Sequence, residues 1–154
     1  ALESIKSFLV SQKEKYVVMS DANIAANIDY ADILAKHKIN VDIILQSVGR
    51  DSTKDITFTV AKGNADETLE CVKKVFDIED KDIICDTSVA KISIVGAGME
   101  SHPGTASKMF EALYERDINI DMIATSEIKI SVLINLEDAD RAVSAIHKAF
   151  FPAE

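Results

Sequence analysis

An internal repeat constrains the fold of this chain more than any other feature of its sequence. Residues 39–47, INVDIILQS, align with residues 118–126, INIDMIATS, at an offset of 79. Further along, residues 56–60 (ITFTV) align with residues 130–134 (ISVLI) at an offset of 74. The two offsets differ between the matched segments, where a hairpin loop tolerates a change of length. The repeat therefore predicts two copies of one small unit, each built around a hairpin.

Hydrophobic spacing predicts the same elements around each hairpin. β-Branched residues dominate several short runs and favour strands, while apolar residues three and four positions apart favour amphipathic helices. Pro103 is expected in the first turn of the helix that opens the second copy, since its fixed backbone angle suits that position. The expected strands are 16–19, 41–48, 56–60, 91–95 and 130–134, and the expected helices are 27–38, 69–76, 106–113 and 139–150.

Each copy then has the order β-α-β-β-α, which lacks one strand of a ferredoxin-like βαββαβ unit. The first copy gains a sixth element from residues 83–86, whereas too few residues follow Phe150 for another strand. We predict that the N-terminal strand-like segment 5–10 completes the second copy, so that the two α+β units are interlocked. The alternative is a strand supplied from outside this chain. The expected domains are residues 14–89, and residues 90–154 together with the N-terminal strand 2–11.

Composition narrows the class of protein. The 154 residues include 17 Lys+Arg and 26 Asp+Glu, a formal charge of −9, and 47% of them are hydrophobic. An acidic chain is a poor ligand for nucleic acid or for an anionic membrane, and no apolar run approaches the ~20 residues of a membrane span. Cys71 and Cys85 form neither a metal pattern nor a disulfide framework, so we expect buried, reduced thiols in a cytoplasmic protein. Because the chain begins at Ala1, a processed product or a fragment is expected.

The most distinctive stretch, residues 91–105, combines an apolar strand, a glycine-rich turn and the start of a helix. Glycines let a ligand approach the backbone, and free amides at a helix N-terminus attract a carboxylate or a phosphate. A dinucleotide-binding loop is disfavoured because Ser101 stands where a third glycine or an alanine is expected. A tight turn that merely requires glycine is the structural alternative.

Polar residues of the second copy are expected beside this loop. Asn119 offers a side-chain amide, and Asp121 or Glu127 offers a carboxylate that pairs with an ammonium group. Helix amides for a carboxylate and an acid for an amine together suit a free amino acid. The alternative for both acids is solvated surface charge.

Catalytic candidates are few. We expect His37 and His147 to lie at the surface of helices, and His102 lies in the glycine-rich loop without the partners of a nucleophile relay. No spacing of His, Cys or carboxylates indicates a metal site, and no phosphate-binding loop is present. The chain alone is expected to catalyse no reaction. An enzyme centred on His102 is an alternative that a turnover assay would test.

The motifs together resemble the regulatory region of aspartate kinases. The second copy carries this resemblance through residues 95–104, 118–120 and 125–132, and the first copy through residues 40–42, Gln46 and residues 55–60. The resemblance covers nearly the whole chain. It implies a tandem pair of interlocked ACT domains that bind end-product amino acids, lysine and often threonine.

The resemblance also sets expectations about partners. The kinase domain of that family, which phosphorylates the aspartate carboxyl with ATP and magnesium, is absent from these 154 residues. The chain is therefore expected to be either a C-terminal fragment or a regulatory beta subunit, with no cofactor of its own. Its expected partners are a kinase domain in cis or a catalytic subunit in trans, and a second copy in a homodimer formed through ACT domains. The pathway implied is lysine, threonine and methionine biosynthesis.

Carried over position by position, the resemblance implies one effector pocket in each copy. The first copy departs from the family pattern where residues 22–25 (ANIA) replace an acidic-basic-Pro-Gly turn, which weakens the expectation of a threonine site there, although Asp21 offers a carboxylate. A structural dimerisation module with vestigial pockets is the alternative function. The expected effector-binding residues are Met99, His102, Ala106, Asn119, Ile120, Asp121, Ser126 and Glu127 in the second copy, and Asn40, Val41, Asp42 and Gln46 in the first.

Overall fold

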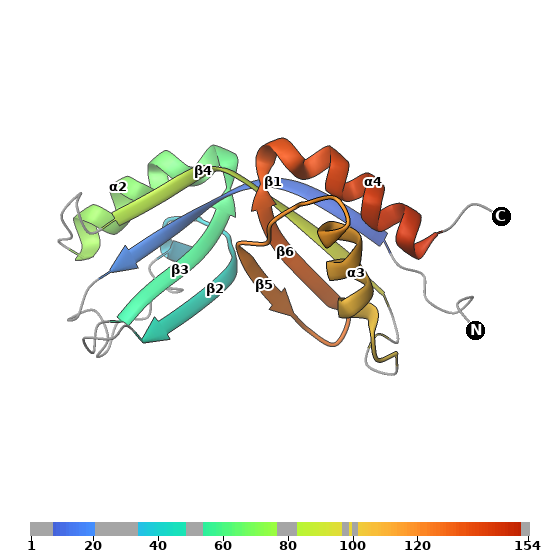
Figure 1. Cartoon of the computed structure of the whole chain (residues 1–154). Coiled ribbons are helices and arrows are strands. Elements are labelled where there is room, and N and C mark those ends of the chain that lie inside the picture. The colour runs from blue at the N-terminus through green and yellow to red at the C-terminus, as the bar shows by residue number, and fades with distance from the viewer. Residues whose placement is uncertain are drawn as a thin grey trace. The chain divides into compact units, whose positions relative to one another are not determined.

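The chain divides into two compact units that follow the sequence repeat. The first-copy unit is Glu14–Thr87, and the second-copy unit combines Ala1–Lys13 with Ser88–Glu154. Strands β1 (Phe8–Ser20) and β4 (Ile83–Val95) each contribute residues to both units. The computed structural model (Figure 1) describes residues 8–20, 34–48, 54–76, 83–96, 99 and 102–151.

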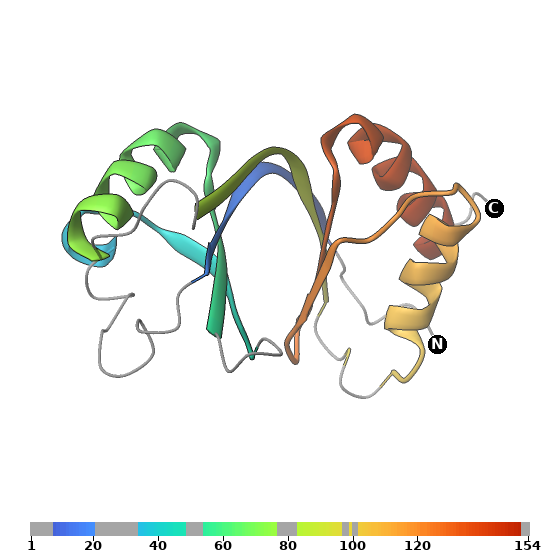
Figure 2. The same ribbon diagram turned by 60° about the vertical axis from the view of Figure 1, so that its left-hand side comes forward.

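The second-copy unit is an antiparallel sheet with both of its helices on one face. β6 pairs with β4 from Val89↔Asn135 to Val95↔Lys129, and with β5 from Met122↔Leu133 to Thr125↔Ile130, which gives the order β4-β6-β5. Figure 2 shows α3 and α4, gold and red, side by side against these strands. The elements after β4 are α3 (Thr105–Tyr114), β5 (Met122–Thr125), β6 (Lys129–Asn135), the 3-10 turn η4 (Leu136–Asp138) and α4 (Ala139–Phe150).

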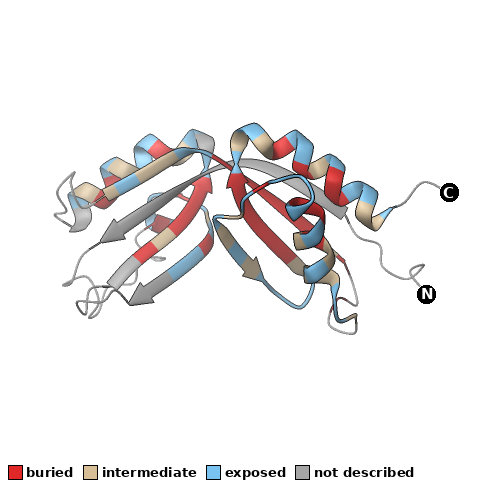
Figure 3. Cartoon of the chain, viewed as in Figure 1, coloured by how far each residue is buried: buried red, intermediate tan, exposed pale blue. Residues whose placement is uncertain are grey.

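Alternation along the strands builds the core of this unit. The alternating residues Ala90, Ile92 and Ile94 of β4 and Ile130, Val132 and Ile134 of β6 belong to one buried cluster with residues of α3 and α4. Figure 3 shows buried residues, in red, along β6 and on both helices. Burial of each such side chain contributes about 1.5–3 kcal/mol to folding. The most deeply buried members of this cluster include Ala90, Ile92, Ile94, Met109, Leu113, Val132, Ile134, Ala142 and Ile146.

The first-copy unit repeats this plan. β3 pairs antiparallel with β1, from Glu14↔Ala61 to Ser20↔Asp55, and with β2, which gives the order β2-β3-β1. Its elements are β2 (Val41–Val48), β3 (Lys54–Ala61), the 3-10 turn η1 (Lys62–Asn64) and α2 (Ala65–Phe76), and residues 34–36 are helical. Its core cluster consists of Leu34, Ile39, Ile56, Phe58, Val60, Ala65, Cys71 and Val72.

The repeat extends to the backbone geometry of a helix end. Lys38 (φ 58°) and Asp117 (φ 52°), which are 79 positions apart, are the two described non-glycine residues with left-handed backbones. In each copy the next residue donates its backbone N–H to a carbonyl five positions earlier, a bond that closes the helix. These bonds join Ile39 to Leu34 at 2.8 Å and Ile118 to Leu113 at 3.1 Å.

The predicted α+β, ferredoxin-like class is confirmed in its elements. Both hairpins are present, as are helices at three of the four expected places, namely α2, α3 and α4. Of the expected helix 27–38, residues 34–36 are helical and residues 27–33 lie outside the described ranges, as do residues 5–7 of the expected N-terminal strand. The interlocked arrangement and the domain bounds 14–89 and 90–154 with 2–11 stay predictions.

Two details of the sequence-based expectation are wrong. Of the segments 5–10 and 16–19, expected as separate strands, residues 8–10 and 16–19 fall on the single strand β1, and the segments 83–86 and 91–95 both belong to β4. The residues between them include no glycine or proline, so nothing forces the extended backbone to turn. Pro103 precedes α3 and does not lie in its first turn, because Gly104 (φ 98°) takes a left-handed conformation that no helix interior accepts.

The structure also places two of the histidines and both cysteines noted in the sequence. His147 is exposed on α4, where its ring lies 5.1 Å from that of Phe151, and His37 is exposed in the turn after the helical residues 34–36. Cys71 is buried and Cys85 is half-buried. Within the described ranges, no three or more His, Cys, Asp or Glu residues are grouped to hold a metal ion. None of the described helices has the length and apolar character needed to cross a membrane.

Candidate functional site

A pocket of about 260 Å³ opens in the second-copy unit, where the glycine-rich loop meets the β5–β6 hairpin. One wall comes from the loop and the first residues of α3, and the other comes from the end of β5, the hairpin turn and the start of β6. The pocket is lined by Met99, His102, Gly104, Thr105, Ala106, Thr125, Ser126, Glu127 and Ile130.

Hydrogen bonds within the loop wall fix its shape. The backbone N–H of His102 donates to the carbonyl of Met99 at 3.1 Å, and the hydroxyl of Thr105 donates to the carbonyl of His102 at 3.0 Å. Met99 is 8% exposed and packs with the core of the unit, so it anchors the loop wall to that core. The imidazole of His102 is half-buried at the pocket.

The start of α3 supplies hydrogen-bond donors to the pocket. Gly104 occupies the position before the helix and has no side chain with which to accept from the first-turn amides. The first turn of any helix has backbone N–H groups without partners inside the helix, and these groups favour an anion. The backbone of α3 therefore offers the pocket a site for a carboxylate, at Thr105 and Ala106.

The hairpin wall is also held by its backbone. Ser126 donates to the carbonyl of Lys129 through its N–H at 2.7 Å and through its hydroxyl at 3.4 Å, which closes the turn. The N–H of Gly96, at the end of β4, donates to the carbonyl of Ile128 at 2.9 Å. This bond joins the turn to the strand that leads into the loop, so the two walls are tied together. Glu127 is exposed on this turn and lines the pocket.

The structure gathers five of the eight predicted second-copy residues into this pocket: Met99, His102, Ala106, Ser126 and Glu127. The other three, residues 119–121, do not line it, because they precede β5 whereas the pocket lies where β5 ends. A strand of four residues advances the chain by roughly 13 Å.

These three residues form a local structure of their own. The side-chain amide of Asn119 donates to the carboxylate of Asp121 at 3.3 Å, and the N–H of Asp121 donates to the carbonyl of Leu133 at 2.9 Å. Ile120 packs against the core. Both polar side chains are exposed, so they are free to face a molecule outside this unit.

Sequence reasoning did not assign four lining residues: Gly104, Thr105, Thr125 and Ile130. Gly104 and Thr105 lie within the glycine-rich stretch of residues 91–105. They were not assigned because Pro103 and Gly104 are both plausible helix boundaries, and the first residue of the helix decides which backbone amides belong to its first turn. Thr125 is the last residue of β5 and Ile130 lies near the start of β6, so the two flank the hairpin turn. Their position beside the glycine-rich loop depends on the number of residues in that turn.

The structure describes the side chains of three of the four first-copy candidates. Asn40 and Asp42 are exposed, and Val41 is half-buried against the core. Gln46 lies on β2, where its side chain is not described, and residues 21–25 lie outside the described ranges.

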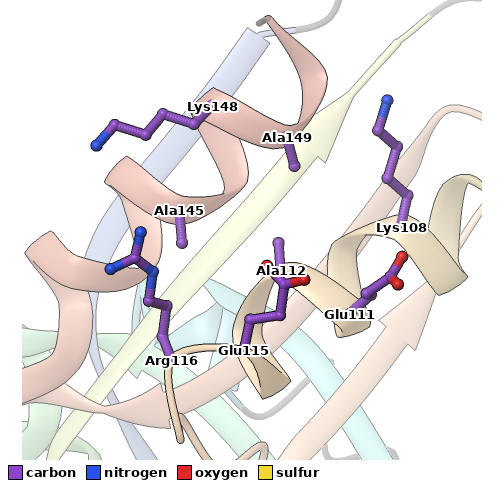
Figure 4. A pocket seen from close by; sticks show the side chains of 8 residues that line it. All are labelled: Lys108, Glu111, Ala112, Glu115, Arg116, Ala145, Lys148 and Ala149. Carbon is purple, nitrogen blue, oxygen red and sulfur yellow. The ribbon is translucent and has the colours of Figure 1, made fainter.

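A second hollow of about 370 Å³ lies between α3 and α4 (Figure 4). Ala112 faces Ala145 and Ala149 across it, and charged side chains surround these small residues. At one end Arg141 links the helices, since it pairs with Asp138 at 2.8 Å and also donates to the carbonyl of Arg116. The charged lining residues are Lys108, Glu111, Glu115, Arg116 and Lys148. This hollow is larger, but it lies on the flanks of two helices and includes no helix N-terminus in its lining, so the loop pocket is the better candidate ligand site.

Comparison with known proteins gives a consistent picture. The ACT domain family matches residues 92–150. The regulatory subunit of aspartate kinase from Thermus thermophilus, in a ligand-free crystal form, superposes with a TM-score of 0.81 and 35% identity, covering 96% of this chain and 99% of that one. A chain from a crystal structure of aspartokinase alpha and beta subunits superposes with a TM-score of 0.78 and 35% identity, covering 92% of this chain and 96% of that one.

Among curated proteins, an aspartokinase of Helicobacter pylori is 48% identical over 117 residues, which are 76% of this chain. The matched region is 29% of the length of that relative. The chain thus spans less than a third of such a relative and nearly all of a regulatory subunit.

Proposed function

The chain belongs to the aspartate kinase family as its regulatory part, and on this premise we propose that it is an amino-acid sensor that controls an aspartate kinase. The nearly full-length match to a regulatory subunit supports this role. The observation that carries it is the loop pocket, which Thr105 and Ala106 at the start of α3 and Glu127 in the hairpin turn all line.

The proposed ligand is an end-product amino acid, with lysine first and threonine second. Its carboxylate binds the amides at Thr105 and Ala106, a position at a helix N-terminus that favours an anion, and its ammonium group pairs with Glu127. Met99 and Ile130 supply apolar contacts for the methylene groups of the ligand. We assign Asn119, Ile120 and Asp121 to contacts made from a neighbouring ACT domain, in keeping with the exposure of the two polar side chains.

Regulation follows from differential binding. An effector that binds one arrangement of the ACT domains more tightly shifts the population toward that arrangement. A coupling free energy of ~1–3 kcal/mol changes the affinity or activity of the coupled site about 5- to 150-fold. In this proposal the regulated step is the phosphorylation of aspartate in lysine, threonine and methionine biosynthesis.

The kinase lies outside this chain. A kinase domain in cis or a catalytic subunit in trans carries the reaction and uses ATP and magnesium, and this chain binds neither. The relative crystallised as alpha and beta subunits supports the arrangement in trans. We also propose a homodimer, because β5 is an edge strand of its unit and an exposed edge tends to pair with another strand.

Two finer questions belong to the same proposal. The first copy holds a second, weaker site at Asn40, Val41, Asp42 and Gln46 if its loop substitutes for the missing glycine turn. The alternative function is a dimerisation module whose pockets are vestigial. The replacement of the acidic-basic-Pro-Gly turn by residues 22–25 (ANIA) favours that alternative for the first copy only.

Isothermal titration calorimetry with L-lysine, L-threonine and L-methionine tests the proposal. We expect saturable heat with lysine, at one equivalent per chain if the second-copy site alone binds and at two if both copies do. Glu127→Ala should weaken this binding at least tenfold because it removes the partner of the ammonium group. Glu115→Ala removes an exposed carboxylate of the same unit outside the pocket and is the matched control.

Two outcomes contradict the sensor proposal. Wild-type protein that gives no heat with any of these amino acids favours the dimerisation module. If Glu127→Ala binds the amino acid as tightly as the Glu115→Ala control does, Glu127 is not part of the binding site.

A further inference from the structure

We propose that Thr105 is a positioning residue for the loop pocket: its side-chain hydroxyl holds His102 and the first turn of α3 in the arrangement that binds a ligand. This inference rests on the proposed function and adds a determinant of affinity that acts through its neighbours. It depends on one hydrogen bond, from the Thr105 hydroxyl to the carbonyl of His102 at 3.0 Å.

That bond belongs to a short series along the loop wall. His102 in turn donates its backbone N–H to Met99 at 3.1 Å, so bonds connect Thr105 through His102 to a residue anchored in the core. The Thr105 hydroxyl has a single proton, and the carbonyl of His102 takes it. Thr105 therefore acts on a ligand through the shape of the turn and not as a hydroxyl donor.

Packing contributes little to the turn that this bond spans. Pro103 and Gly104 are both exposed, and a Cβ added to Gly104 would meet no described atom within 4 Å. Glycine populates many backbone conformations, so the left-handed angle of Gly104 (φ 98°) needs hydrogen bonds to persist. One such bond runs from the N–H of Lys108 to the carbonyl of Gly104 at 2.9 Å, on the helix side, and the Thr105 hydroxyl supplies the bond on the loop side.

The pocket needs this turn in one conformation. The amides that meet a carboxylate sit directly after Gly104, and the imidazole of His102 lies directly before Pro103, so rotation at Gly104 moves the two apart. A ligand that binds only the ordered turn loses affinity in proportion to the fraction of molecules in which the turn is displaced. We expect removal of the hydroxyl to weaken ligand binding about three- to tenfold.

Three variants test the inference. Thr105→Val removes the hydroxyl and keeps the size of the side chain, whereas Thr105→Ser keeps the hydroxyl and removes the methyl group. Thr68→Val is the matched control, because the Thr68 hydroxyl donates to the carbonyl of Asn64 at 2.5 Å in the first-copy unit and Thr68 does not line the pocket. Hydrogen–deuterium exchange at the amides of His102 and Lys108 reports on the turn without any ligand.

In Thr105→Val we expect exchange at these two amides to accelerate severalfold, with wild-type rates in Thr105→Ser and in Thr68→Val. Calorimetry with L-lysine and L-threonine should show the same order of affinities. Unchanged exchange in Thr105→Val overturns the inference, as does equal loss of protection in Thr105→Ser. Wild-type protein that binds neither amino acid contradicts the proposed function, while exchange still decides the role of Thr105 in the turn.

Discussion

The two copies of the repeat share a core and differ at the site. Equivalent positions are buried in both, as Ile39 and Ile118 are at 4% and 5% exposure, and Phe58 and Val132 at 2% and 0%. The 3-10 turns η1 and η4 precede the second helix of each copy at the same offset of 74. The repeat thus preserves what folding requires: core positions, helix ends and hairpins.

Much of the pocket is built from parts that do not repeat, although Ser126 and Ile130 align with Ser47 and Ile56. Glu127 aligns with Val48, and the exposed turn at Pro103 and Gly104 has no counterpart among residues 21–25, which include no glycine or proline. Asn119 and Asp121, which do repeat as Asn40 and Asp42, lie outside the pocket. The comparison indicates that the repeated Asn and Asp lie apart from the loop pocket of their own unit, and that the second copy is the stronger candidate for a live site.

Truncation of one matched core leucine in each copy tests whether the cores are equivalent. Leu34 and Leu113, which are 79 positions apart, are 2% and 0% exposed. Leu34→Ala and Leu113→Ala should each lower the free energy of unfolding by about 2–5 kcal/mol, since each leaves a cavity in a packed core. Urea unfolding followed by circular dichroism gives the two values.

Leu45→Ala is the control, because Leu45 is 40% exposed. It should lower the free energy of unfolding by much less than Leu34→Ala or Leu113→Ala does. A Leu34→Ala effect no larger than that of Leu45→Ala would break the comparison, since the first copy would then lack a core as tightly packed as the second.

The sequence was a good guide to the parts that follow a period, and a poorer guide to the parts that depend on single residues. The hairpins and helices α3 and α4 follow from alternation and helical spacing. The repeat assigns residues 83–86 and 91–95 to different copies and so predicts two strands, although no glycine or proline separates them and they form the single strand β4. The start of α3 is ambiguous in the sequence because both Pro103 and Gly104 are helix-boundary residues. Only the family resemblance places Met99 and Glu127 in one pocket from the sequence, because the bond between Gly96 and Ile128 that ties the two walls together follows from no local pattern.

Glycine substitution at the two left-handed residues sharpens the comparison at the helix ends. A left-handed backbone is strained for residues with a Cβ, but Asp tolerates it better than Lys does. Lys38→Gly should therefore raise the free energy of unfolding, by about 0.5–1 kcal/mol, and Asp117→Gly should raise it by less. Thermal and urea unfolding of both variants measure the difference.

Lys36→Gly places glycine within the helical residues 34–36 and serves as the opposite control, since it should destabilise the protein. If Lys38→Gly destabilised the protein as much as Lys36→Gly does, glycine would relieve no strain at Lys38. The helix ends at Lys38 and Asp117 would then not be equivalent in solution.

The smallest expected effect concerns Cys71, which aligns with Ala145 at the offset of 74 and is buried as that residue is. Burial raises the pKa of the Cys71 thiol, and the carboxylate of Glu67 raises it further. The folded protein therefore holds this proton more tightly than the unfolded chain does. The resulting stabilisation is fully present below the ordinary thiol range, near pH 8.5, and is lost as the pH rises through the raised value.

Cys71→Ala, which installs the residue of the second copy, should remove this contribution to the pH dependence. Wild-type protein should lose more stability than the variant between about pH 8 and pH 10, and the difference isolates Cys71 because all other titrating groups are common to both. Urea unfolding of both proteins at several pH values measures it. Parallel pH profiles would show that the thiol ionises as readily in the folded protein as in the unfolded chain, and that the two copies do not differ electrostatically at this core position.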